Sequence, residues 1–145
     1  MFRIPRTDNA ATTILIRLMV GLVFFTEFLQ KFILPELQGA GRFAIIGLPT
    51  PNFLGTWVGS FEAVCGLLVL MGLLTRVASI PLLIIKLVAI FTTKAEILAN
   101  KGVWDLLHES RTDWAMLLGS LFLIIKGGGR WSVDRQLTPP QYARL

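Results

Sequence analysis

The strongest constraint on the fold is the presence of four apolar segments, each close to the length that crosses a bilayer. They are residues 13–32, 56–74, 77–93 and 114–129, and the last reaches this length only when Lys126 and the following glycines are included. A helix needs about 20 residues to cross the hydrocarbon core of a membrane. We therefore expect an all-α protein, a single domain built as a bundle of four transmembrane helices.

The composition favours lipid over water as the surroundings of this chain. Hydrophobic residues make up 54% of the 145 residues and charged residues 16%, and the mean hydropathy is +0.67. Soluble domains are about one quarter charged, so this chain has too little polar surface for water. We interpret the net charge of +5 as lysine and arginine facing anionic lipid, and we expect no nucleic-acid partner.

The segments between the spans indicate how the helices are connected. Residues 75–76 are the whole link between the second and third spans, which forces an antiparallel hairpin. Residues 35–55 are rich in glycine and proline, and residues 94–113 mix apolar with charged side chains. We expect both stretches to form short helical segments at the membrane interface.

The distribution of basic residues predicts the orientation. Four spans place both termini and the link at residues 75–76 on one side, which holds seven Lys or Arg against two acidic residues. The other side holds five of each kind. Because cytoplasmic loops carry the excess of Lys and Arg, we expect a plasma-membrane protein with both termini in the cytoplasm. Trp104, Trp114 and Trp131 are expected at the membrane edges.

Charged residues inside the predicted spans are the candidate functional site. At a rise of about 1.5 Å per residue, Glu27, Glu62 and Lys86 all lie roughly 15–21 Å from the cytoplasmic edge. Lys31 follows Glu27 at the i,i+4 spacing and could join them. Each such charge costs about 2.5–3.5 kcal/mol on insertion. Two interpretations stay open, namely ion pairs that fix the helix register, or a polar pocket for a proton, an anion or a quinone head group.

Small residues indicate how the second span packs. Gly55, Gly59 and Gly66 share one helical face with Glu62, and the first two form a GxxxG pair. Small residues let helix backbones approach closely in lipid. We therefore expect this face, and Glu62 with it, to lie against another helix.

Three further residues have simpler interpretations. Arg17 lies about 6 Å inside the cytoplasmic edge, so its side chain is expected to extend to the lipid head groups. Cys65 is the single cysteine and lies in an apolar run, where a thiol is buried and unreactive. His108 is the single histidine, and without a second ligand near it we expect a solvated loop residue and no metal site.

The chain resembles the DoxX family in four stretches, which are residues 17–32 (RLMVGLVFFTEFLQKF), 39–47 (GAGRFAIIG), 62–76 (EAVCGLLVLMGLLTR) and 111–134 (RTDWAMLLGSLFLIIKGGGRWSVD). The resemblance implies a four-span inner-membrane protein linked to membrane redox systems, such as thiosulfate:quinone oxidoreductase subunits or an oxidative-stress complex with superoxide dismutase and a sulfurtransferase. The residues that match family motifs are Glu27, Gln30, Lys31, Glu62, Gly66, Arg76, Arg111 and Asp113. Phe28 and Lys86 depart from the family pattern.

Three functions are compatible with these features. The first is an accessory, non-catalytic membrane subunit of a redox or stress-response system, whose cluster binds a quinone or a sulfur species. With one cysteine and no metal motif, a bound cofactor or a partner redox protein would supply the electron transfer. The second is a small-molecule carrier or exporter that works as a homo-oligomer. The third is an assembly factor that holds membrane partners through the glycine face of the second span.

Overall fold

The computed structural model describes residues 10–38, 41, 44, 45, 47 and 49–137 of the chain. Within these residues all regular secondary structure is helical and no strand is present, which confirms the predicted all-α class. The helices are α1 (Thr13–Ile33), α2 (Pro35–Gln38), α4 (Pro51–Met71), α5 (Thr75–Lys101), α6 (Val103–Glu109), α7 (Arg111–Lys126) and α8 (Val133–Gln136).

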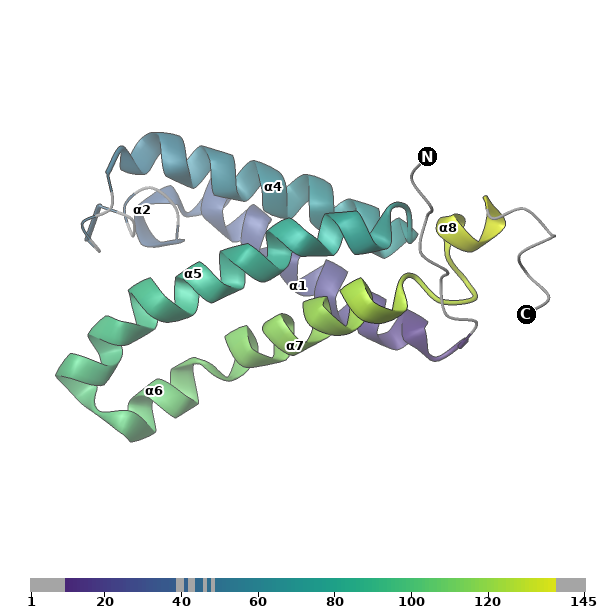
Figure 1. Ribbon diagram of the computed structural model, residues 1–145. Coiled ribbons are helices and arrows are strands. Elements are labelled where there is room, and N and C mark those ends of the chain that lie inside the picture. Colours follow the sequence, from purple (N-terminus) through teal and green to yellow (C-terminus); the bar gives the residue numbers. More distant parts are fainter. Residues whose placement is uncertain (1–9, 39–40, 42–43, 46, 48, 138–145) are drawn as a thin grey trace.

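The four long helices α1, α4, α5 and α7 lie along one another in a bundle (Figure 1). Helix α1 packs mainly on α4 and α5 mainly on α7, while α4 and α5 form the predicted antiparallel hairpin. At one end, α8 lies beside the start of α1. Toward the other end, α5 and α7 are joined by α6 and diverge from α1 and α4 (Figure 1).

Several helix ends differ from the predicted segments. Helix α4 begins at Pro51, five residues earlier than predicted, and α5 continues to Lys101 instead of ending at residue 93. The predicted interfacial stretch 94–113 therefore consists of the last turns of α5, the helix α6 and the first turn of α7. The other interfacial stretch, residues 35–55, lies partly outside the described residues.

The fourth predicted segment extends too far at its end. Helix α7 ends at Lys126, and Gly127 and Gly129 have φ angles of +82° and +80°, which an α-helix does not accommodate. The expectation that the glycines would lengthen this helix to residue 129 was therefore wrong. With 16 residues, α7 is shorter than the about 20 residues of a typical span.

The glycine face of α4 is used for packing inside the chain. Gly55, Gly59, Glu62 and Gly66 are all buried. A β-carbon on Gly66 would lie 3.4 Å from the carbonyl oxygen of Gly21 on α1, and one on Gly59 would lie 3.0 Å from the Phe32 ring. The predicted close approach of α4 to another helix is therefore made to α1, so this face is not free for a partner protein.

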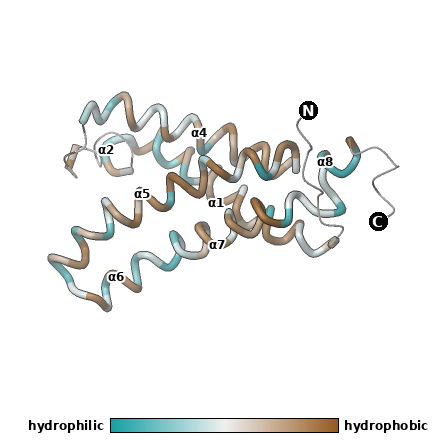
Figure 2. Tube along the Cα trace, viewed as in Figure 1, coloured by the Kyte–Doolittle hydropathy of each residue, from teal (hydrophilic) through white to brown (hydrophobic). Residues whose placement is uncertain are grey.

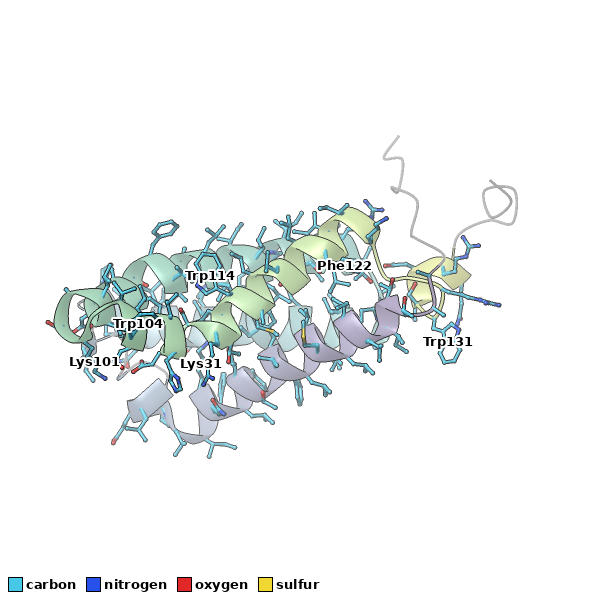
Figure 3. The ribbon with its side chains drawn as sticks, turned by 90° about the horizontal axis from the view of Figure 1, so that it is seen from below. Lys31, Lys101, Trp104, Trp114, Phe122 and Trp131 are labelled. Carbon is cyan, nitrogen blue, oxygen red and sulfur yellow. The ribbon has the colours of Figure 1, made fainter. Side chains whose placement is uncertain are left out.

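The outer surface of the bundle is apolar. The side chains of Leu15, Val64 and Leu118 are 65%, 59% and 61% exposed. Hydrophobic stretches run along the long helices (Figure 2). A soluble monomer rarely exposes so much contiguous apolar surface. Of the helices that the structure describes, α1 and α4 are long and apolar enough by themselves to cross a membrane. Trp104 and Trp131, both strongly exposed, lie at opposite ends of the bundle (Figure 3).

Arg17 closes the end of the bundle near α8. Its Nε donates to the carbonyl of Val69 (3.0 Å) and Nη2 to that of Leu70 (2.8 Å), both in the last turn of α4. Nη1 donates to the carbonyls of Gly128 (3.0 Å) and Trp131 (2.7 Å) in the segment after α7. With 4% of its surface exposed, Arg17 does not extend to lipid head groups, and that prediction was wrong. The last carbonyls of a helix have no intrahelical donor, which explains why a buried guanidinium fits here.

Asp134 connects α8, the last described helix, to the end of the bundle that contains Arg17. Its carboxylate accepts hydrogen bonds from the backbone N–H groups of Leu74 (2.7 Å) and Thr75 (2.9 Å), at the start of α5. A carboxylate at this position also interacts favourably with the helix dipole. The backbone N–H of Asp134 donates to the carbonyl of Gly72 (2.9 Å), and that of Arg130 to the carbonyl of Ala10 (3.2 Å). The segment after α7 therefore contacts both the start of the described chain and the α4–α5 turn.

Candidate functional site

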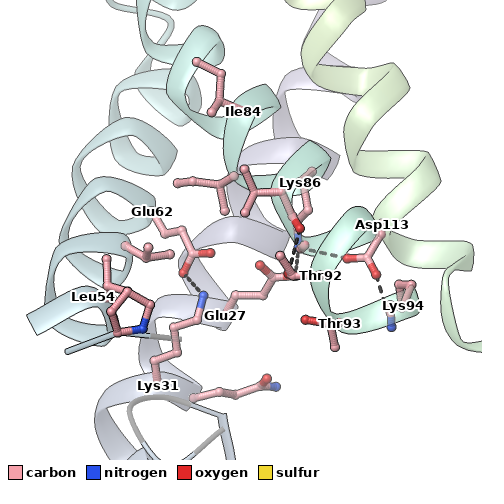
Figure 4. A pocket seen from close by; sticks show the side chains of 16 residues that line it. Glu27, Lys31, Leu54, Glu62, Ile84, Lys86, Thr92, Thr93, Lys94 and Asp113 are labelled. Carbon is pink, nitrogen blue, oxygen red and sulfur yellow. Dashed lines mark hydrogen bonds and ion pairs between the residues drawn. The ribbon is translucent and has the colours of Figure 1, made fainter. Parts of the chain in front are cut away.

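Six charged side chains from the four long helices gather around one pocket (Figure 4). This charge cluster consists of Glu27 and Lys31 on α1, Glu62 on α4, Lys86 and Lys94 on α5, and Asp113 on α7. The cluster therefore contains equal numbers of acidic and basic side chains, three of each.

Two sets of ion pairs make up the cluster. Lys31 forms an ion pair with Glu62. The Lys86 ammonium lies 2.5 Å from a Glu27 oxygen and 3.2 Å from an Asp113 oxygen. The second Asp113 oxygen lies 3.3 Å from Lys94 Nζ. Lys86 thus joins α5 to both α1 and α7, and its ammonium also lies 5.2 Å from the centre of the Phe24 ring, within cation–π range.

Helical periodicity places these residues on the inward-facing sides of their helices. Glu27 follows the buried Phe24 by three residues and Lys31 follows it by seven, which places both on the buried face of α1, and Lys86 follows the buried Leu82 by four on α5. Counted from the helix ends near α8, Glu62 lies about 14 Å along α4 and Lys86 about 17 Å along α5. Glu62 and Lys86 therefore lie at a similar level near the middle of their helices, whereas Lys31 lies in the last turn of α1 and Asp113 in the first turn of α7.

A cavity of about 570 Å³ adjoins the charge cluster. Its charged and amide lining residues are Glu27, Gln30, Lys31, Glu62, Lys86, Lys94 and Asp113. Apolar residues of α4 and α5 form much of the remaining wall, among them Leu54, Val58, Ile84, Ile85, Val88 and Ala89. Such a mixture of apolar wall and a few convergent polar groups is typical of small-molecule sites.

Glu62 is the most notable residue of the cavity. Its side chain is fully buried, and one carboxylate oxygen pairs with Lys31. The other oxygen, Oε1, has no hydrogen-bond partner within the part of the chain that the structure describes. Because an unsatisfied buried polar atom costs about 1–3 kcal/mol, more when charged, this oxygen is suited to accept a hydrogen bond from a bound molecule.

The structure brings together some of the predicted site residues and separates others. Gln30 and Asp113 line the cavity. Arg76 does not, because it lies near α8, where Nη1 donates to the carbonyl of Ile124 (3.2 Å). Arg111 is exposed, and its Nε donates to the carbonyl of His108 (2.9 Å).

The sequence analysis missed Lys94 as a site residue because the third segment was expected to end at residue 93. The spacing of eight residues from Lys86 places both lysines on one face of a helix.

The remaining sequence predictions concern single residues. Cys65 is buried, as predicted. His108 is exposed but lies on α6, a helix, and its ring nitrogen Nε2 is 3.3 Å from the Arg111 guanidinium. Across the described ranges, no group of three or more His, Cys, Asp or Glu side chains is placed to hold a metal ion.

Comparison with known proteins gives the family. The chain matches the DoxX protein-family model over residues 12–95. It is 47% identical over 142 residues to "Uncharacterized membrane protein Rv3486" of Mycobacterium tuberculosis, covering 94% of this chain and 87% of that protein. It is 28% identical over 123 residues to "Putative oxidoreductase CatD" of Bacillus subtilis, covering 84% of each. No solved structure matches. The chain belongs to the DoxX family and is a membrane protein.

Proposed function

We propose that α1, α4, α5 and α7 each cross the plasma membrane and that both termini are cytoplasmic. The apolar surface of the four-helix bundle supports four crossings, and α5 has 27 residues, more than a span needs. The end formed by Ala10, the α4–α5 turn and α8 is a single face of the molecule. Among the described residues, that face carries four basic side chains at or beyond the ends of the long helices, Arg76, Lys126, Arg130 and Arg135, against the acidic Asp134, which favours the cytoplasmic side.

A tag experiment tests this topology. We expect a reporter fused before residue 1 and a reporter fused after residue 145 both to be active only in the cytoplasm. A reporter inserted at Gly102, between α5 and α6, should be active only on the opposite side. If the two terminal reporters map to different sides, the number of crossings is odd and the proposed topology is wrong.

For the activity, we propose an accessory subunit of a membrane redox system that holds the head group of a quinone in the cavity. The single observation that carries this proposal is the buried Glu62 Oε1 with no partner among the described residues. This oxygen can accept a hydrogen bond from a quinol hydroxyl. The adjacent Lys31 ammonium has three N–H donors and can donate one to a quinone carbonyl.

The charge balance of the site supports a neutral ligand. Each of the three lysines of the charge cluster lies within ion-pair distance of a carboxylate. A sulfur oxyanion would add negative charge beside carboxylates whose ammonium partners are already paired, and an uncompensated charge inside the bundle costs several kcal/mol. A quinone head group adds no charge and leaves the ion pairs intact.

The comparisons support the redox setting. A relative is named a putative oxidoreductase, and in this proposal electrons come from a partner redox protein, while the present chain positions the quinone. The competing assembly-factor function loses its main support, because the glycine face of α4 packs on α1 within the chain. Transport of a small molecule through an oligomer is the competing function, and the experiment below distinguishes it from quinone binding.

Binding of a quinone to Glu62→Gln provides the test. We expect the purified protein in nanodiscs to bind decylubiquinone, and the variant to bind it at least about tenfold more weakly, because a hydrogen bond to a charged group contributes about 1.5–3 kcal/mol. Titration of bound quinone measures both affinities. The matched control is Glu109→Gln, an exposed glutamate on α6, which should bind like the wild type.

Two outcomes would contradict the proposal. Equal quinone affinity for the wild type and Glu62→Gln would remove Glu62 from the site. Counterflow of a small solute in proteoliposomes that depends on Glu62, without any quinone binding, would favour the carrier function instead.

A further inference from the structure

The cavity is a furrow between α4 and α5 with α1 behind it. On α5 its lining residues extend from Ile84 to Lys94, about 15 Å along the helix axis. On α4 they are Leu54, Val58 and Glu62, which repeat every four residues and so lie along one face. Helix α7 contributes only Asp113 among the described lining residues. Since α1 forms the back and α7 lies on the far side of α5, no described helix covers the front of the furrow.

The open front of the furrow is apolar. Ile84 is 53% exposed and Val88 is 51% exposed, and both line the cavity. Both lie on α5, on the side of the furrow opposite Val58, which is half-buried. The furrow therefore has charges at its back and hydrophobic side chains at its edge.

The depth of this opening places it against hydrocarbon. Glu62 lies about 14 Å from the α8-side end of α4 and about 17 Å from the other end, so it is near the middle of that helix. If α4 spans the membrane, as proposed above, the surroundings at that level are lipid acyl chains. An aqueous solute would have to reach the front of the furrow through the bilayer.

We infer that the ligand enters sideways from the bilayer between α4 and α5 and is an amphiphile with an uncharged, hydrogen-bonding head and an apolar tail. The head of this ligand contacts Glu62 and Lys31, and its tail extends past Val58, Ile84 and Val88 into the lipid acyl chains. A phospholipid does not fit this description, because its charged head group belongs at the membrane surface and not at the level of Glu62. This inference rests on the proposed function and adds the access route and the class of ligand.

The first test measures which medium the opening faces. A spin label is attached at Val88→Cys in a Cys65→Ser background, with the protein in liposomes. We expect relaxation by oxygen, which dissolves in lipid, to exceed relaxation by a water-soluble nickel chelate. The control label at Trp104→Cys, at the α6 end of the bundle, should respond more strongly to nickel than the label at residue 88. Stronger access of nickel at residue 88 would overturn the lateral route.

The second test locates the apolar tail of the bound quinone. The probe is a decylubiquinone analogue with a photoreactive diazirine at the end of its tail. We expect it to label α4 and α5 around Val58, Ile84 and Val88 in the wild-type protein. Ala89→Phe, which narrows the furrow, should reduce this labelling at least fivefold. Leu87→Phe should not reduce it, because Leu87 lies on the same helix and is exposed but does not line the cavity.

The outcomes separate this inference from the proposed function. Quinone binding that depends on Glu62, with tail labels on α7 or on residues near α6, would overturn the lateral route and leave the proposed function intact. Unchanged labelling in a folded Ala89→Phe protein would do the same. Absence of any quinone binding to the wild-type protein would overturn the proposed function and this inference together.

Discussion

Replacing Arg17 by methionine is expected to lower the free energy of unfolding by about 3–5 kcal/mol, the scale of removing one partner from a buried charged network. The guanidinium donates to four backbone carbonyls from two separate segments, the end of α4 and the residues after α7. Methionine fills a similar volume but leaves these carbonyls without the donor. Denaturant titration in mixed micelles, followed by helical circular dichroism, measures the change.

Two matched variants serve as controls for the stability loss of Arg17→Met. Arg17→Lys keeps the charge, but one ammonium cannot span carbonyls that a planar guanidinium reaches from three nitrogens, so we expect an intermediate loss. Arg130→Met removes an exposed arginine from the same end of the bundle and should change the free energy of unfolding by less than about 0.5 kcal/mol. A stability loss for Arg17→Met no larger than that of Arg130→Met would show that Arg17 does not hold the end together.

The second large effect is expected for Lys86→Met, again about 3–5 kcal/mol. Lys86 is buried and contacts carboxylates on two other helices, Glu27 and Asp113. Without it, the charge cluster has an excess negative charge inside the bundle, and Glu27 loses its ammonium partner. The same unfolding titration measures the loss.

A double variant shows whether the loss comes from the unbalanced charge. We expect Lys86→Met with Glu27→Gln to be more stable than Lys86→Met alone by at least about 1 kcal/mol, because the second change removes the excess charge. The exposed pair of Lys101 and Glu109, 3.4 Å apart, serves as the comparison, and Lys101→Met should cost at most about 1 kcal/mol. A double variant less stable than Lys86→Met alone would contradict this explanation.

The level of the charged residues could be derived from the sequence, but their pairing could not. A fixed rise per residue in helices that start from one membrane edge is enough to place Glu27, Glu62 and Lys86 in one layer. Pairing depends on how the helices cross. Gly59 lets α1 approach α4 so closely that the Lys31 side chain passes beside it, and Lys31 therefore reaches Glu62 and not Glu27, its neighbour on the same helix.

Arg17 shows a second limit of sequence reasoning. Its distance from the membrane edge suggested a side chain that reaches the lipid head groups. What decides its position is the backbone of residues 127–131, where Gly127 and Gly129 adopt positive φ angles. The carbonyls of Gly128 and Trp131 turn toward α1 in this segment. Apolar patterning contains no information on such carbonyl directions, because it reports side chains and not the backbone.

The separation of Arg17 from its acceptors has a consequence for synthesis of the chain. Arg17 lies 111 and 114 residues before Gly128 and Trp131, so at about 5–20 residues per second these acceptors leave the ribosome about 6–23 seconds later. During that interval the first helix carries a guanidinium that only the α4 carbonyls, water or lipid head groups can satisfy. The hydrogen bonds that join α1 to the segment after α7 therefore form only late in synthesis, after the other three long helices have been made.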